Sequence, residues 1–240
     1  MRTLPFVKMQ AQGNDFVIMD HRQGEHPNFS EEEVGLLCDR RLGIGCDQLL
    51  ILNVDALADC RLQIFNSDAS EAQNCGNGLR CVGALLLAQS QKASCEVALS
   101  DRSIHIEQGE HGIRVYMGKA VIVDQTSAYV DIDMGNPHRV YFETPQSFPK
   151  DRNIEIISGE IFGEAAGEHI YIDIIERGVG PTLACGSGAC AVAAAVWLNE
   201  NHHNPLMIHM QGGVVTVSGT SDALVLEGDV TSVFVGDIQI

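Results

Sequence analysis

The sequence predicts an α+β fold made of two pseudo-symmetric α/β halves, each with strands wrapped around a central apolar helix. The glycine-rich turn CGNG at residues 75–78 is repeated as CGSG at 185–188, nearly half the chain later. Each turn leads into an apolar run, at 81–88 and at 189–198, that is typical of a buried helix. Much of the remaining sequence alternates short apolar runs with glycine turns, as strands do.

The first half contains the signals of several short strands and one surface helix. Ser30 is a suitable N-cap, and the three glutamates after it complement the positive end of a helix, which we expect from Glu31 to Arg41. Gly109 and Gly112 bracket a hairpin turn. We predict strands at 4–9, 15–20, 48–53 and 61–66, and a strand-like pattern from 94 to 117.

The second half begins near Gly118 and repeats this organisation around the CGSG turn. We predict strands near 121–124, 129–133 and 169–175, and antiparallel strands in the alternating tail, 206–240. We therefore assign residues 1–117 with about 228–240 to a first half, which carries Cys75. Residues 118–227 form the second half, which carries Cys185.

Composition and charge narrow the range of functions. Hydrophobic residues make up 45% and charged residues 20% of the chain, as in ordinary globular proteins. A formal net charge of −17 would repel nucleic acid and anionic membrane surfaces, so we expect neither as a partner. The chain has no run long enough for a membrane span and no signal-peptide pattern, which predicts a cytoplasmic protein. We therefore expect the eight cysteines to be reduced.

A cysteine begins each predicted central helix, where the first backbone N–H groups lack partners and stabilise negative charge. A thiol there is expected to have a lowered pKa, and the glycines that follow let a ligand approach the backbone. Two such turns facing each other would make a symmetric site around one carbon. Inverting a stereocentre needs a base on one face and an acid on the other, and it then requires neither a metal nor a cofactor in principle.

Other interpretations of the cysteines remain open at this stage. Cys81 and Cys190 follow the two turn cysteines, so each pair could bind zinc, although structural zinc sites favour shorter spacings. The turn cysteines could also be inert buried thiols beside packing glycines, or redox-sensing thiols. CGNG does not match a dinucleotide-binding fingerprint, because the third glycine and its strand–helix–strand context are missing.

At these residues the sequence resembles the diaminopimelate epimerase family. The resemblance rests on GNDF (13–16), GIGCDQLL (43–50), FNSDASEAQNCGNGLRC (65–81), MGNPH (134–138) and ERGVGPTLACGSGACA (176–191). It implies two pseudo-twofold-related domains with the active site in the cleft between them. It also implies interconversion of LL- and meso-diaminopimelate, on the way to lysine and peptidoglycan, without pyridoxal phosphate or any other cofactor. A homodimer is a possible assembly.

The resemblance also assigns roles to matching residues. Cys75 and Cys185 would be the two acid–base thiols, and His138 and Glu176 would be their polar neighbours, one near each cysteine. The expected substrate-binding residues are Asn14, Gln48, Asn66, Gly76, Asn77, Asn136, Asn153, Arg177, Gly186 and Ser187. The amides suit an ammonium and a carboxylate, and Arg177 offers a bidentate fork for a carboxylate.

The sequence departs from the family pattern in places. It is shorter than usual, mainly between His138 and Asn153, where a helical excursion is expected. Ala69 stands where glycine is usual, Asn74 precedes the first cysteine, and Pro181 replaces a commonly acidic residue. Another cofactor-independent racemase on this scaffold, acting on proline for example, is the nearest alternative function. A non-catalytic redox or zinc-binding thiol protein is the alternative outside that class.

Overall fold

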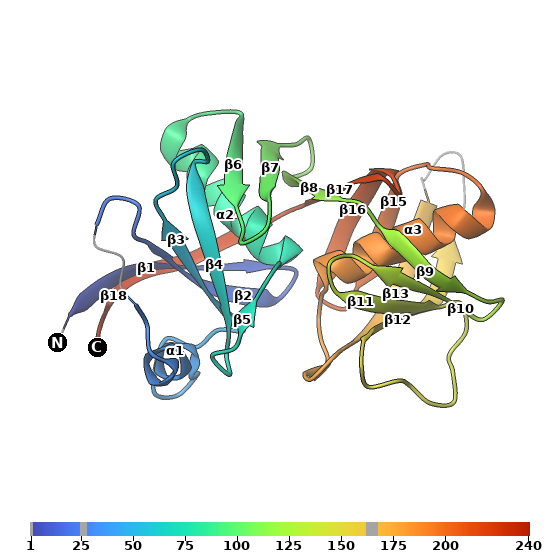
Figure 1. Ribbon diagram of the computed structural model, residues 1–240, viewed down its shortest axis with the longest axis horizontal. Helices are drawn as coiled ribbons and strands as arrows, with labels where there is room; N and C mark the ends of the chain where they lie inside the picture. Colours follow the sequence, from blue (N-terminus) through green and yellow to red (C-terminus); the bar gives the residue numbers. More distant parts are fainter. Residues whose placement is uncertain (1, 25–27, 162–167) are drawn as a thin grey trace. The chain divides into compact units, whose positions relative to one another are not determined.

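The computed structural model describes residues 2–24, 28–161 and 168–240. The chain divides into two compact units (Figure 1). Unit 1 comprises Met1–Ile113 together with Asp229–Ile240, and unit 2 comprises Arg114–Gly228. Each combines parallel and antiparallel strand pairs with one long helix, which confirms the predicted α+β class.

In unit 1 the strands surround helix α2 (Gly76–Ser90), which contacts β1, β2, β6 and β7. Strands β2 and β3 pair in parallel, as do β4 and β6, while β1 pairs antiparallel with both β2 and β18. The strands of this unit are β1 (Thr3–Ala11), β2 (Asn14–Asp20), β3 (Gln48–Asn53), β4 (Cys60–Asn66), β5 (Glu71–Ala72), β6 (Ser94–Ala98), β7 (Ser103–Gln108) and β18 (Thr231–Gln239).

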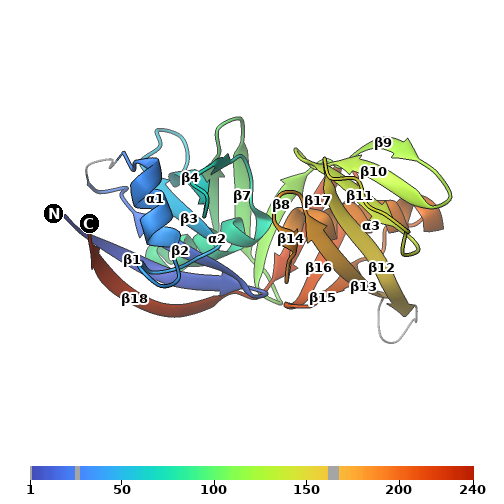
Figure 2. The same cartoon turned by 90° about the horizontal axis from the view of Figure 1, so that it is seen from below.

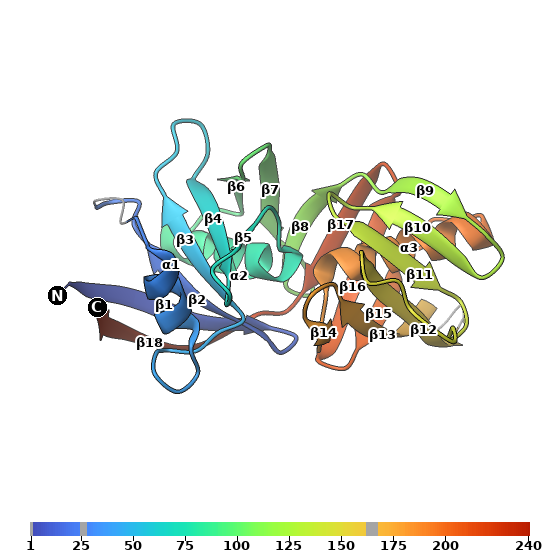
Figure 3. The same ribbon diagram turned by 60° about the horizontal axis from the view of Figure 1, so that its bottom comes forward.

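In unit 2 the strands surround helix α3 (Gly186–Glu200), which contacts β10, β11, β12, β15, β16 and β17 (Figure 3). The strands are β8 (Ile113–Gly118), which begins at the unit boundary, β9 (Val121–Gln125), β10 (Tyr129–Asp133), β11 (Pro137–Tyr141), β12 (Asn153–Ile161), β13 (Glu168–Glu176), β14 (Gly180–Pro181), β15 (Leu206–Met210), β16 (Gly213–Thr220) and β17 (Ala223–Gly228).

The two units share one strand topology. The six strands from β10 to β15 in unit 2 pair in the same order as the six from β1 to β6 in unit 1. Each parallel or antiparallel pair in one unit has a pair of the same sense in the other. The parallel ladders align residue by residue, since Phe16 lies opposite Gln48 in unit 1 and His138 lies opposite Asn153 in unit 2. The internal repeat seen in the sequence is therefore a repeat of structure.

The central helices form where the apolar runs predict them, and both are longer than those runs. In α3 every residue from Gly188 to Trp197 is buried, as expected for a helix that is apolar on all sides and covered by strands. Both helices end at a residue in the left-handed conformation, Gln91 for α2 and Asn201 for α3. Within the described ranges, none of the helices has the length and apolar character needed to cross a membrane.

Helix α1 (Glu31–Cys38) belongs to unit 1 and begins as predicted. Ser30 and Glu33 form a reciprocal capping box at its start. The helix ends before the predicted Arg41, because Asp39 is extended and its carboxylate accepts hydrogen bonds from the backbone N–H groups of Arg41 and Leu42. In unit 2 the corresponding connection, residues 142–152, is fully described and contains no helix, as the shortened sequence indicated.

The two ends of the chain lie side by side in unit 1 (Figure 2). The backbone N–H of Arg2 donates to the Ile240 carbonyl at 2.7 Å, and the Ile240 N–H donates to the Arg2 carbonyl at 3.0 Å. The pairing continues along β1 and β18, from Thr3 opposite Gln239 onwards. The last residues of the sequence therefore complete the sheet of unit 1.

Ala69 adopts a conformation that suits glycine. Its φ is 67°, in the left-handed region, within the turn that links β4 to β5. Left-handed φ costs an L-residue about 1–2 kcal/mol, part of which glycine recovers. We therefore expect Ala69→Gly to raise the free energy of unfolding by about 0.5–1 kcal/mol, as measured by urea denaturation.

The matched control is Ala88→Gly, at an exposed position of α2. The same substitution inside a helix should lower the free energy of unfolding by about 1 kcal/mol. A destabilised Ala69→Gly variant would show that Ala69 is not strained.

Candidate active site

Cys75 and Cys185 occupy the same position at the start of the two central helices. Each is an extended N-cap residue, with φ/ψ of −152°/104° for Cys75 and −136°/114° for Cys185. The backbone N–H of Gly78 donates to Cys75 Sγ at 3.3 Å, and that of Gly188 donates to Cys185 Sγ at 3.3 Å. Each sulfur therefore caps its helix by accepting from the backbone N–H of the third helical residue.

The second glycine of each turn packs closely against strand side chains. A Cβ built on Gly188 would overlap the carboxylate of Glu155. At the equivalent Gly78, a Cβ would lie 3.2 Å from Leu50 Cδ1 and 3.4 Å from Phe16 Cε1. A larger residue would push the strand side chains away from the helix start, so the spacing CGxG follows from packing as well as from ligand access.

Cys75 is partly exposed and lies beside two amides from the predicted binding set. Its thiol is directed at Asn14 Oδ1, 4.0 Å away, and Asn77 Nδ2 donates to the same oxygen at 3.2 Å. The buried Arg80 donates in turn to Asn77 Oδ1 at 2.6 Å, which fixes the orientation of that amide. The structure thus brings Asn14, Cys75 and Asn77 together.

Asn14 is hydrogen-bonded to a network of charged side chains. Asn14 Nδ2 donates to Asp47 Oδ2 at 2.9 Å, and Arg40 bridges Asp47 and Asp15. Lys8 also binds Asp15. Although burial opposes it, the hydrogen bonds and charges of Arg40 and Lys8 hold the pKa of Asp15 well below its usual range.

Gln48 and Asn66 form a separate pair in unit 1. They lie opposite each other at one end of the β3–β4 ladder, and Gln48 Nε2 donates to Asn66 Oδ1 at 2.8 Å. Asn66 Nδ2 donates to Ser70 Oγ at 3.0 Å, within the turn that contains Ala69. The amides are therefore oriented by the ladder and the turn.

Cys185 has a more enclosed environment than Cys75, with 7% exposure. Burial, followed by the charges of Glu176 and Glu155, raises the pKa of the Cys185 thiol well above its usual value. Bonds from the Ser187 hydroxyl and the Gly188 N–H act in the opposite direction. The lowered pKa expected from the helix start is therefore wrong for Cys185, because burial and two carboxylates outweigh the helix N-terminus.

His138 is completely buried in unit 2 and is bonded at both ring nitrogens. Its Nδ1 lies 2.8 Å from Glu155 Oε1, and its Nε2 lies 3.1 Å from Asn136 Oδ1. Strand β11 places His138 opposite Asn153 of β12. The structure brings His138 together with Asn136, and it adds Glu155, which sequence reasoning missed.

Glu176 is the last residue of β13, and Arg177 follows it. Glu176 Oε1 accepts from Thr182 Oγ1 at 2.7 Å, and its charge acts on Cys185. The Arg177 N–H donates to Asn153 Oδ1 at 2.9 Å, while the exposed Arg177 guanidinium donates to the Asp151 carbonyl at 3.4 Å. The arginine fork is thus accessible to a ligand.

The remaining binding-set residues lie in the first turns of the two helices. Gly76 follows Cys75, while Gly186 and Ser187 follow Cys185, and the Ser187 hydroxyl is 3.5 Å from Cys185 Sγ. Asp47 was not predicted as a site residue, although it lies inside the GIGCDQLL segment. Nor was Glu155, whose signal is a single carboxylate between two isoleucines in NIEI.

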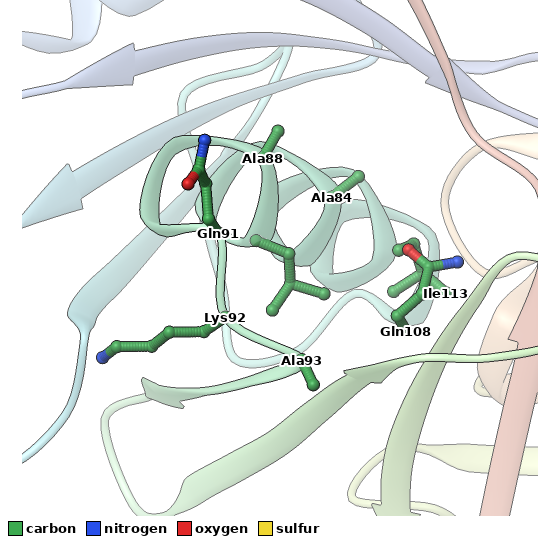
Figure 4. Close-up of a pocket in the computed structure, with 8 residues that line it drawn as sticks. Ala84, Ala88, Gln91, Lys92, Ala93, Gln108 and Ile113 are labelled. Atoms are coloured by element: carbon green, nitrogen blue, oxygen red, sulfur yellow. The ribbon is translucent and has the colours of Figure 1, made fainter.

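Two further features lie outside these groups. Among the described residues, His, Cys, Asp and Glu side chains do not gather in any set of three or more that could hold a metal ion. A hollow of roughly 470 Å³ lies at the C-terminal end of α2, beside Ala84, Ala88 and Gln91 (Figure 4). Since Cys75 caps the opposite end of α2, this hollow is not part of the cysteine site.

Comparison with known protein sequences identifies one family. The chain matches the family model described as "Diaminopimelate epimerase" over residues 6–123 and 134–233. A diaminopimelate epimerase from Caldanaerobacter subterraneus subsp. tengcongensis is 32% identical over 275 aligned positions, which cover 98% of this chain and 99% of the relative. One from Rhizorhabdus wittichii is 31% identical, over 98% of this chain and 95% of the relative.

Comparison with solved structures identifies the same fold. A Bacillus anthracis protein of the phenazine biosynthesis PhzF family superposes with a TM-score of 0.73 at 18% identity, over 100% of both chains. A hydroxyproline epimerase from Agrobacterium vitis superposes with a TM-score of 0.72 at 10% identity, over 99% of this chain and 92% of the other. At these identities the likeness concerns the fold.

The environments of the two thiols predict different reactivities. Iodoacetamide should modify Cys75 before Cys185 at pH 8, because alkylation requires an accessible thiolate. Glu176→Gln removes one of the two carboxylates that disfavour the Cys185 thiolate, so labelling of Cys185 should become several-fold faster. Peptide mass mapping over time measures both rates.

Glu200→Gln, at the exposed far end of α3, is the matched control and should change neither rate. Equal labelling of the two cysteines in the wild-type protein would contradict the assignment of Cys185 as the protonated thiol.

Proposed function

The chain belongs to the diaminopimelate epimerase family, and from that premise we propose that it interconverts LL- and meso-diaminopimelate by moving one proton at Cα. The observation that carries the proposal is the duplicated N-cap cysteine, Cys75 in unit 1 and Cys185 in unit 2. Stereochemical inversion needs two acid–base groups that act on opposite faces of one carbon. Two thiols at equivalent helix-start positions supply such a pair.

One proton leaves the substrate for one thiolate, and a second proton passes from the other thiol to the substrate. Since Cys185 is held as the neutral thiol, we assign Cys75 as the base in the resting enzyme. Cys75 takes the Cα proton, the Cα–H bond electrons remain on the substrate, and Cys185 delivers its own proton to the opposite face. The products are the inverted substrate, a Cys75 thiol and a Cys185 thiolate.

Helix-start N–H groups stabilise the charge that develops on the substrate. We assign the reacting carboxylate to the backbone of Gly76 and Asn77 in unit 1 and of Gly186 and Ser187 in unit 2. Free N–H groups at helix starts are suited to bind and stabilise an anion. The proposal therefore routes no step through a cofactor.

The rest of the binding set suits a second amino-acid head group. The exposed guanidinium of Arg177 can bind a carboxylate through two N–H groups, and Asn66 and Asn153 offer amide partners. Proline or hydroxyproline has no distal carboxylate for this arginine. This difference favours diaminopimelate over a proline-type substrate.

The eight reduced cysteines support a location in the reducing cytoplasm.

The decisive experiment follows deuterium incorporation in deuterated water, using purified protein without added cofactor. LL-Diaminopimelate should acquire deuterium at Cα and give the meso isomer, as read by NMR and chiral chromatography. Proline and trans-4-hydroxyproline serve as parallel substrates. Exchange with either of those, and none with diaminopimelate, would replace the proposed substrate by a proline-type one.

Replacing either helix-start thiol should stop inversion. Cys75→Ala and Cys185→Ala each remove one of the two acid–base groups, so epimerisation should fall by at least about 1000-fold. Cys95→Ala is the control, since Cys95 is buried on β6 and should leave turnover unchanged. Near-wild-type turnover of Cys185→Ala would rule out the two-thiol mechanism.

Arg177→Lys should weaken substrate binding although the charge is kept, because lysine cannot form the planar fork. A charge-assisted contact is worth about 1.5–3 kcal/mol, so Kd should rise by roughly 10- to 150-fold in calorimetric titration. Arg61→Lys is the matched control, because Arg61 binds Asp55 near the opposite end of the β3–β4 ladder from Gln48 and Asn66. An unchanged Kd for Arg177→Lys would place Arg177 outside the site.

A further inference from the structure

Glu155 is a carboxylate buried in an apolar strand. It lies on β12 between Ile154 and Ile156, and its side chain is 0% exposed. Its Oε1 contacts His138 Nδ1, and its Oε2 has no hydrogen-bond partner within the described part of the chain. A buried and partly unsatisfied carboxylate is costly, so its presence requires a reason other than stability.

The positions in unit 1 that are equivalent to His138 and Glu155 hold apolar side chains. The two parallel ladders align Phe16 with His138 and Leu50 with Glu155. The third residue of each central helix lies against these positions, since a Cβ on Gly78 would lie close to Phe16 and Leu50, and one on Gly188 would overlap Glu155. Because unit 1 forms this packing with an apolar pair, the fold does not need a polar pair in unit 2.

The polar pair fixes the orientation of an amide. The His138 ring is held by Glu155 at Nδ1 and by Asn136 Oδ1 at Nε2, at 2.8 and 3.1 Å. A ring held at both nitrogens has one defined orientation. Both ring nitrogens face an oxygen, Glu155 Oε1 at Nδ1 and Asn136 Oδ1 at Nε2, so the two N–H groups of the Asn136 amide remain available to another acceptor.

We propose that Glu155 is a positioning residue of the epimerase site, which orients the His138 ring and, through it, the Asn136 amide that binds substrate. The inference rests on the proposed function. It extends the site to a residue of β12 that does not itself touch the substrate.

The charge of Glu155 provides a competing explanation. The same carboxylate contributes to holding Cys185 as a thiol. Two substitutions separate the contact from the charge. Glu155→Gln keeps the length of the side chain and an oxygen that can accept from His138 Nδ1–H, but it has no charge. Glu155→Asp keeps the charge but withdraws it by about 1.5 Å, beyond hydrogen-bond reach of Nδ1.

If Glu155 acts by contact, the glutamine variant should remain active and the aspartate variant should not. We expect kcat/KM of Glu155→Gln to stay within about threefold of wild type. We expect that of Glu155→Asp to fall by roughly 10- to 100-fold, mainly through a higher KM, because Asn136 is misplaced. Long-range ¹H–¹⁵N NMR of the imidazole should show a protonated Nδ1 in wild type and Glu155→Gln, and lose that fixed pattern in Glu155→Asp.

The opposite order, with Glu155→Asp active and Glu155→Gln inactive, would overturn the proposal in favour of charge. Equal losses in both variants, or no loss in either, would also overturn it. The double variant His138→Phe/Glu155→Leu introduces the residue types that unit 1 has at Phe16 and Leu50. It should unfold cooperatively in thermal denaturation, which checks that these two positions tolerate substitution. If wild-type protein does not epimerise diaminopimelate, the proposed function fails, and the NMR pattern still decides whether Glu155 holds the ring.

Discussion

In both units the backbone N–H of the third helical residue donates to the sulfur of an N-cap cysteine. This bond requires a helix that starts at the cysteine and a third residue without a side chain. Strand side chains pack against that third residue, namely those of Phe16 and Leu50 in one unit and that of Glu155 in the other. The strands around α2 and α3 can be regarded as the support that keeps each sulfur aimed at the free N–H groups of its helix.

The two units share their strand topology but differ in the side chains that surround the helix-start cysteine. Unit 1 places an apolar pair beneath its cysteine, and unit 2 places an imidazole and a carboxylate there. Asn66 and Glu176 each precede the turn cysteine by the same interval, yet one is neutral and the other charged. The same backbone therefore surrounds two thiols with different electrostatics, and Cys185 stays protonated where a bare helix start would favour its thiolate.

Local signals in the sequence predicted what depends on local physics. The CGxG turns, the apolar runs and the Ser30 capping box predicted α1, α2 and α3, and the resemblance predicted the family. Strands β11 and β12 escaped prediction, because Pro137 opens one and Glu155 interrupts the apolar pattern of the other. The pKa of Cys185 could not be predicted either. It depends on burial and on Glu155, thirty residues earlier in the chain, and only the folded structure brings these together.

The pairing of β1 with β18 has a consequence for how the protein is made. Unit 2 is one continuous segment, whereas unit 1 needs both ends of the chain. On the ribosome, unit 2 can therefore reach its native contacts while the first part of unit 1 still lacks an edge partner. That partner, β18, emerges after unit 2, and β1 remains open to wrong pairing until then. Because the termini meet, a short peptide could also join them and allow new chain ends to be opened elsewhere.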